Sequence, residues 1–134
     1  MPFESALELR HRPGHSRWEV IAPLRYRRFT LTPALPSGYR PRASHLIEVQ
    51  VGYLSDLASV PRLARRLVDA NHQATRRPAV LHDYLYTHLT HRYTRREADR
   101  IFYEALVEEG TARPLAWLMW QAVRIGGRGN WSCA

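Results

Sequence analysis

Cysteine is almost absent from the sequence, and its one occurrence, Cys133, lies next to the C-terminus. A single cysteine excludes a disulfide framework within the chain and a cysteine zinc cluster. This usage is typical of a reducing compartment, or of a particle assembled in one. The 134 residues have the size of one domain, which can bury an adequate core without metals or disulfides. We therefore predict a single domain over residues 1–134.

Long apolar runs are missing as well. The longest candidate, residues 115–125, has about half the length needed to span a bilayer, and it contains Gln121 and Arg124. The first residues lack the basic start and apolar run of a secretory signal. The sequence thus predicts no transmembrane segment.

Lysine is absent too, so arginine alone carries the positive charge, and the net charge is +8. Such a charge can serve nucleic acid, an anionic lipid surface or an acidic protein. The arginines are spread over the whole chain, which favours a solvated basic surface and disfavours nucleic acid as a partner. Arginines surround an aromatic residue at only two places, namely Arg25, Arg27 and Arg28 around Tyr26, and Arg92, Arg95 and Arg96 around Tyr93.

The first third of the chain has the pattern of short strands and turns. Apolar runs at residues 18–21 and 29–31 are separated by prolines and glycines. Residues 45–51 alternate apolar and polar side chains, as a half-buried strand does, and Gly52 ends the run. We predict a β-rich region over residues 1–55.

The second half has the periodicity of helices. A proline suited to a first helical turn opens a predicted helix over about residues 78–89. Thr94 and Glu97 have the spacing of a capping box, and the apolar stripe that follows ends at Gly110. A third stripe predicts a helix over about residues 114–126.

The predicted fold class is therefore α+β. A small N-terminal antiparallel β region precedes about three packed helices. The predicted order is the β-rich region, a loop over residues 52–62, a helical region over 63–126 and a C-terminal tail over 127–134.

His82 and Asp83 are the first candidates for chemistry, and Tyr86 lies one turn beyond His82 on the same helix face. An imidazole can act as a general base or bind a metal, and a carboxylate can hold a hard cation. The alternative is a core histidine with satisfied hydrogen bonds beside a surface aspartate. From this dipeptide alone the alternative is the better interpretation.

Asp99 is the second candidate. The short connection over residues 90–93 predicts that the two helices pack antiparallel, which can place Asp99 opposite His82. A carboxylate that accepts a hydrogen bond from a histidine fixes the tautomer of the ring and raises its basicity. An acidic residue near a helix N-terminus can instead serve only the helix dipole, and both interpretations stay open.

The loop over residues 52–62 follows the best strand, where a rigid scaffold often places functional side chains. Asp56, Ser55 and Ser59 offer oxygen ligands, and Arg62 closes the segment. The alternative is a turn in which Asp and Ser side chains cap backbone amides. The His-Glu-x-x-His pattern of a zinc protease is absent from the whole chain.

Four ordered motifs carry a resemblance to a known family. They are GYLSDLASVPR at residues 52–62, AVLHDYLY at 79–86, READRIF at 96–102 and AVRIGG at 122–127. Together they resemble domain-of-unknown-function family 1353, small proteins of tailed phages and prophages, over roughly residues 45–131. The chain departs from that pattern where a proline is expected shortly before Gly52. The resemblance implies expression in a host cytoplasm, a possible place in the virion and other phage structural proteins as partners.

A shorter likeness concerns mechanism. His82-Asp83 with Tyr86, and Asp99 on the next helix, looks like the catalytic helix pair of phospholipases A2, especially the disulfide-poor bacterial kind. That likeness implies His82 as the base, Asp99 as the residue that orients it and Asp83 as a calcium ligand. Here the loop around Asp56 would stand where those enzymes have a glycine-rich calcium loop.

Two functional hypotheses follow. In the first, Asp56, His82, Asp83 and Asp99 form a metal-assisted hydrolase site, with Ca²⁺ or Zn²⁺ and a lipid or cell-envelope substrate. In the second, the protein is a non-enzymatic virion component, such as a tail, baseplate or neck accessory protein. The same polar cluster is then a structural network.

Overall fold

The computed structural model describes residues 3–11, 17–31, 34–55, 73–126 and 131. In this part of the chain all strands precede all helices, which confirms the predicted α+β class. The elements in order are β1 (Leu9–His11), β2 (Trp18–Val20), β3 (Leu24–Leu31), β4 (Arg42–Val49), β5 (Leu54–Ser55), α2 (Gln73–His88), α3 (Arg95–Glu108) and α4 (Arg113–Gly126).

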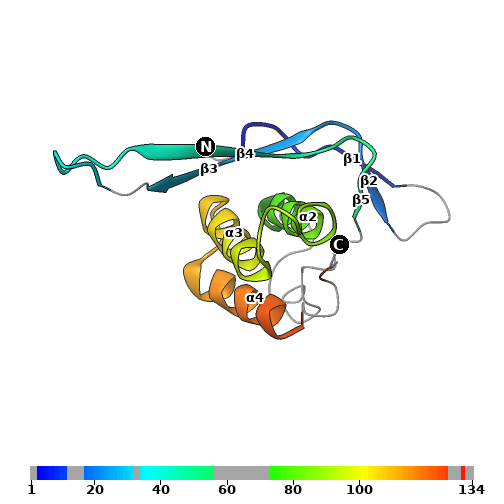
Figure 1. The fold of residues 1–134 in the computed structure, drawn as a ribbon. Helices are drawn as coiled ribbons and strands as arrows, with labels where there is room; N and C mark the ends of the chain where they lie inside the picture. Colours follow the sequence, from blue (N-terminus) through cyan, green and yellow to red (C-terminus); the bar gives the residue numbers. More distant parts are fainter. Residues whose placement is uncertain (1–2, 12–16, 32–33, 56–72, 127–130, 132–134) are drawn as a thin grey trace.

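The strands form two antiparallel sheets that lie on one side of the helices (Figure 1). One sheet has the order β1-β2-β5, and the other is the ribbon of β3 and β4. α2 and α3 lie beneath the strands, and α4 forms the layer farthest from them. The distal end of the β3–β4 ribbon extends past the helices.

Side chains on the β3–β4 ribbon alternate between a buried face and a solvated face. Its register pairs Leu24 with Val49 and Tyr26 with Ile47, and all four side chains are buried. Between them the facing pair Arg25 and Glu48 forms an ion pair on the outer surface. Neighbouring side chains on a strand point to opposite faces, so one face packs on the helices and the other remains solvated.

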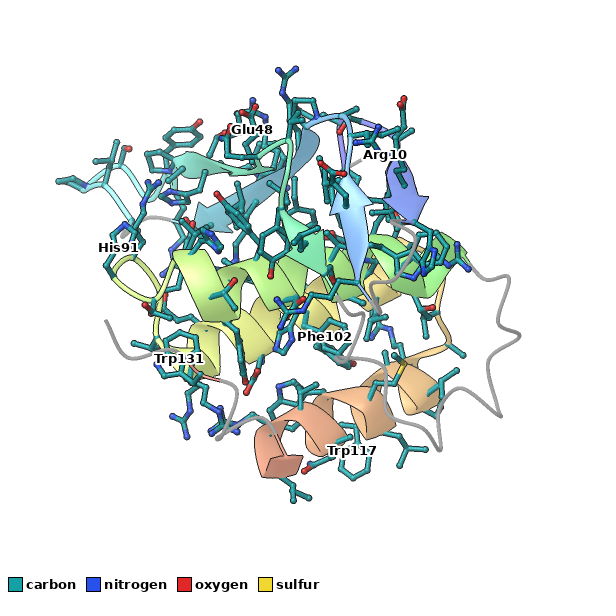
Figure 2. All side chains as sticks on the ribbon, turned by 90° about the vertical axis from the view of Figure 1, so that its right-hand side faces the viewer. Arg10, Glu48, His91, Phe102, Trp117 and Trp131 are labelled. Atoms are coloured by element: carbon teal, nitrogen blue, oxygen red, sulfur yellow. The ribbon has the colours of Figure 1, made fainter. Side chains whose placement is uncertain are left out.

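Two apolar clusters join the layers. The first connects the inner side of the strands to α2 and α3, and its strand residues meet Val80, Leu81 and Leu85 of α2. The second lies between α3 and α4 and consists of Phe102, Leu106, Ala116, Met119 and Val123. Figure 2 shows Phe102 in the interior and Trp117 on α4.

The helix caps follow the sequence closely. Thr94 and Glu97 make both hydrogen bonds of a capping box, which confirms that prediction. Gly110 has a φ of 98°, a left-handed conformation that closes α3 without the steric cost of a Cβ atom.

Two predicted boundaries are wrong. α2 begins at Gln73, and Pro78 lies inside it rather than opening it. Pro78 is the sixth residue of α2, past the first turn, so the helix lacks the backbone hydrogen bond that an N–H at residue 78 would donate to residue 74. β4 ends at Val49 rather than residue 51, because Gly52, with a φ of 93°, turns the chain toward β5.

Candidate functional site

The structure brings His82 and Asp99 into direct contact. The His82 Nε2 atom lies 2.7 Å from the Asp99 Oδ1 atom, across the interface of α2 and α3. Both side chains are buried, with exposed fractions of 3% for His82 and 0% for Asp99. The predicted juxtaposition of these two residues is therefore confirmed.

Asp99 accepts two further hydrogen bonds. The Tyr86 hydroxyl donates to the same Oδ1 atom at 2.5 Å, and an Arg124 Nη1 atom donates to Oδ2 at 2.8 Å. Burial acts to raise the pKa of Asp99, but the hydrogen bonds from His82, Tyr86 and Arg124 outweigh it and lower the pKa below its ordinary value. The carboxylate is thus ionised at neutral pH, and three helices meet at it.

This ionisation fixes the tautomer of the neutral His82 ring. An ionised carboxylate can only accept hydrogen bonds, so the Nε2 atom must carry the proton that it shares with Asp99. The Nδ1 atom is then the unprotonated, basic nitrogen of the neutral ring. Asp99 also stabilises the imidazolium that forms when Nδ1 takes up a proton.

Aromatic rings hold the imidazole in place. The His82 ring centroid lies 4.2 Å from that of Tyr86 and 4.7 Å from that of Phe102. Trp131 meets the Tyr86 ring edge to face, with centroids 5.0 Å apart. Burial and the negative charge of Asp99 raise the pKa of Tyr86, so its hydroxyl stays protonated and keeps its role as a donor.

Asp83 lies on α2 beside His82 and faces the strands. The buried Ser55 of β5 donates a hydrogen bond from its hydroxyl to the Asp83 Oδ2 atom at 2.9 Å. Ser55 in turn pairs with Trp18 of β2. Asp83 is therefore positioned by the sheet, whereas His82 is positioned by α3.

The other predicted site residues, Asp56, Ser59 and Arg62, lie outside the described residues. Among the residues that the structure does describe, no group of three His, Cys, Asp or Glu side chains could hold a metal ion. The only predicted metal ligand that can be placed is Asp83, and Ca²⁺ or Zn²⁺ binding stays a prediction.

Two arginines that the sequence analysis did not assign complete the site. Arg124 forms the ion pair with Asp99 from the last turn of α4. Arg95 donates from its Nη2 atom to the carbonyl oxygens of Val123 and Arg124, at 3.1 and 2.5 Å, and so caps the end of α4. A signal was present, since Arg124 is the one charged residue in an otherwise apolar and amide run.

The first arginine cluster considered for nucleic acid is engaged within the protein. Arg25 pairs with Glu48, Arg27 with Glu4 and Arg28 with Glu104. The aromatic residue between them, Tyr26, is buried and cannot stack on a base. These contacts lie within the protein, and the absence of a nucleic-acid partner stays a prediction.

The fold and the site define a small α+β domain with a buried histidine–aspartate pair in its helical layer. The chain belongs to the family described as protein of unknown function DUF1353, whose model matches residues 18–123. This match extends from β2 into α4 and includes every residue of the hydrogen-bonded pair. Comparison with curated proteins and with solved structures gave no match. Within the described residues, every helix is too short or too polar to cross a membrane.

Proposed function

We propose that the protein is a hydrolase in which His82 activates a water molecule as a general base. The observation that carries this proposal is the buried hydrogen bond between His82 Nε2 and Asp99 Oδ1. It leaves Nδ1 as the basic nitrogen, and it supplies a fixed negative charge for the imidazolium formed during proton transfer.

Asp99 acts in this proposal as a positioning residue. Its carboxylate is held by Tyr86 on one oxygen and by Arg124 on the other, so it cannot rotate away from His82. Arg124 also balances the charge of Asp99 in the buried interior, where an unpaired carboxylate would be costly. The ring is therefore preorganised before any substrate arrives.

Asp83 and Asp56 are the proposed ligands of a cation. A carboxylate can hold a hard cation, and the hydrogen bond from Ser55 fixes the position of the Asp83 carboxylate. Such an ion, when bound, would polarise an ester or phosphoryl oxygen beside the water activated by His82. The substrate class that we propose is a lipid or cell-envelope ester or amide, in the phage or prophage context that the family resemblance suggested.

Calorimetry tests the cation. We expect the wild type to bind one Ca²⁺ or Zn²⁺ ion, and Asp83→Asn to abolish binding while the far-ultraviolet circular dichroism stays unchanged. Glu8→Gln, which removes an exposed carboxylate from the N-terminal segment, is the matched control. Absence of binding at millimolar Ca²⁺ and at micromolar Zn²⁺ would exclude the metal-assisted form of the proposal.

Hydrolysis tests the base. The wild type is assayed on short-chain nitrophenyl esters and on phospholipid vesicles, and we expect His82→Gln to lose at least a hundredfold in rate. Asp99→Asn should lose activity mainly in kcat, with KM little changed, because it removes the carboxylate that positions the His82 ring. Equal rates for the wild type and a folded His82→Gln protein would refute the proposal.

The second candidate is a non-enzymatic virion component, and the shape of the β3–β4 ribbon favours it. The ribbon extends past the helices (Figure 1) and exposes Phe29 and Leu46, and Tyr39 is exposed in the connection between its two strands. Apolar side chains on a protruding ribbon are typical of surfaces that dock on other proteins. Immunodetection in purified phage particles tests this candidate, and absence from the particles would exclude it.

A further inference from the structure

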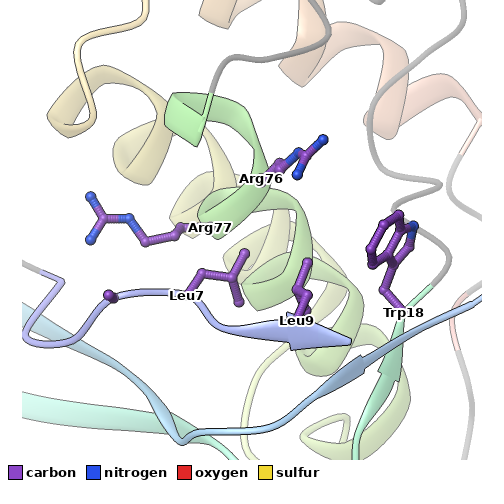
Figure 3. A pocket seen from close by; sticks show the side chains of 6 residues that line it. Leu7, Leu9, Trp18, Arg76 and Arg77 are labelled. Carbon is purple, nitrogen blue, oxygen red and sulfur yellow. The ribbon is translucent and has the colours of Figure 1, made fainter. Parts of the chain in front are cut away.

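A second candidate site lies away from His82, between the N-terminal strand segment and the first turns of α2. A cavity of about 320 Å³ opens there, and its described lining consists of Ala6, Leu7, Leu9, Trp18, Arg76 and Arg77 (Figure 3). Ligand pockets in proteins begin at about 300 Å³, so the cavity suits a small molecule. No residue of the hydrogen-bonded pair lines it.

One side of the cavity is apolar because of strand alternation. Leu7 and Leu9 face inward and pack against the first apolar cluster, whereas Glu8 and Arg10 between and beyond them are exposed. Trp18 adds an aromatic wall from β2, the strand paired with β1. This side would favour an alkyl chain or a flat apolar group.

The two arginines differ in their surroundings. Arg77 donates to Glu109 from both Nε and Nη2, and to the Ser5 carbonyl from Nη1, while its guanidinium stacks over the Phe3 ring. Its charge is thus balanced by Glu109, and it serves as a fixed wall. In Figure 3 Arg77 points away from Trp18, whereas Arg76 points toward the side on which Trp18 stands.

Arg76 brings a second guanidinium group to the cavity. The described lining contains no acidic side chain. Arg76 also lies near the N-terminus of α2, where the backbone N–H groups favour a negative charge. An arginine offers five N–H donors, so it can hold an anion in addition to its contacts within the protein.

We propose that this cavity binds a small amphipathic anion, an alkyl chain that ends in a carboxylate or a phosphate group. The alkyl chain lies against Leu7, Leu9 and Trp18, and the anionic group meets Arg76. At about 30 Å³ for a water-sized group, the volume accommodates roughly ten non-hydrogen atoms, the size of octanoate. The proposal is independent of hydrolysis at His82.

Calorimetry with four probes tests both parts of the proposal. Octanoate and octyl phosphate carry the chain and the charge, 1-octanol carries the chain alone, and inorganic phosphate carries the charge alone. We expect the two amphipathic anions to bind at least tenfold more tightly than either partial probe. The tighter of the two then identifies the headgroup as carboxylate or phosphate.

Variants locate the site. Arg76→Gln should weaken octanoate or octyl phosphate by roughly tenfold or more, the value of one charge-assisted hydrogen bond. Arg100→Gln, whose side chain is 66% exposed on α3, is the matched control and should bind like the wild type. Leu9→Trp should fill the cavity and abolish binding, with the circular dichroism confirming that it folds.

Three results would overturn the proposal. They are absence of binding by both amphipathic anions, equal binding of 1-octanol and octanoate, and an Arg76→Gln protein that binds as tightly as the wild type. His82→Gln provides a further check, because it should leave this binding unchanged even if it abolishes hydrolysis.

Discussion

Asp99 and Glu108 are two carboxyl groups on α3, the first buried and the second exposed, and each accepts a hydrogen bond from a tyrosine hydroxyl. Tyr86 donates to Asp99 at 2.5 Å, and Tyr26 donates to Glu108 at 2.8 Å. Burial raises the pKa of both groups, but the net pKa of Asp99 is lowered and that of Glu108 is raised. The fully buried carboxyl group is thus the one whose pKa is lowered, although both accept a hydrogen bond from a tyrosine.

The neighbours explain this difference. Asp99 receives additional hydrogen bonds from His82 and Arg124, which stabilise its ionised form. Glu108 has the nearby negative charges of Glu104 and Glu109, which disfavour ionisation. Asp99 is thus ionised although it is buried, because cationic and ring N–H donors surround it.

Of the variants that test this comparison, the removal of the Asp99 carboxylate should change the free energy of unfolding the most. Asp99→Ala leaves Arg124 and His82 without their buried acceptor, and we expect a loss of about 3–5 kcal/mol in the free energy of unfolding. Urea unfolding followed by circular dichroism measures it. The exposed ion pair of Arg25 and Glu48 is the control, because Glu48→Gln should give an unfolding midpoint indistinguishable from that of the wild type. Equal midpoints for both variants would contradict the assigned role of Asp99.

Replacing either tyrosine by phenylalanine should have an intermediate effect on the free energy of unfolding. Tyr86→Phe removes a hydrogen bond to a charged carboxylate, and we expect a cost of about 1.5–3 kcal/mol. Tyr26→Phe should cost less, because its acceptor Glu108 is disfavoured in the ionised form. Urea unfolding of both variants at neutral pH tests the order, and a larger loss for Tyr26→Phe would reverse our account.

The contributions of Asp99 and Glu108 to stability should change with pH in opposite directions. The pKa of Asp99 is lowered on folding, so its contribution is present above the unfolded pKa and is lost as the pH falls through the folded value. The pKa of Glu108 is raised, so its contribution is present below the unfolded pKa and is lost as the pH rises through the folded value.

Asp99→Asn should therefore be more destabilising at about pH 6 than at about pH 3. Relative to the wild type, Glu108→Gln should be more favourable at the higher of these two pH values. Urea unfolding at both pH values gives the four differences. The same sign of pH dependence for both variants would contradict the comparison.

The sequence predicted the local part of this arrangement well. The capping box at Thr94 and the short connection before it place α3 against α2, and that was sufficient to bring Asp99 opposite His82. These features depend on neighbours within one or two turns. Arg124 was missed because its ion pair depends on how α4 folds back over α3, which no local pattern specifies.

Other misses have similar causes. The division of the strands into two sheets depends on pairings such as Glu19 of β2 with Leu54 of β5, between segments far apart in sequence. The early start of α2 was missed because Pro78 usually marks a first helical turn, whereas here the preceding turn is helical as well. The cavity beside Arg76 likewise requires the N-terminal strand to lie along α2.

The hydrogen bond between Tyr26 and Glu108 joins residues that are 82 positions apart, whereas the bonds of Asp99 to His82 and Arg124 span 17 and 25 positions. Contacts between distant residues close large loops and form late in folding. We therefore expect the helices to assemble first and the ribbon to dock afterwards. In chevron plots, Asp99→Asn should mainly slow folding, and Tyr26→Phe should mainly accelerate unfolding. The protein would then open from its strand side while the histidine–aspartate pair is still intact.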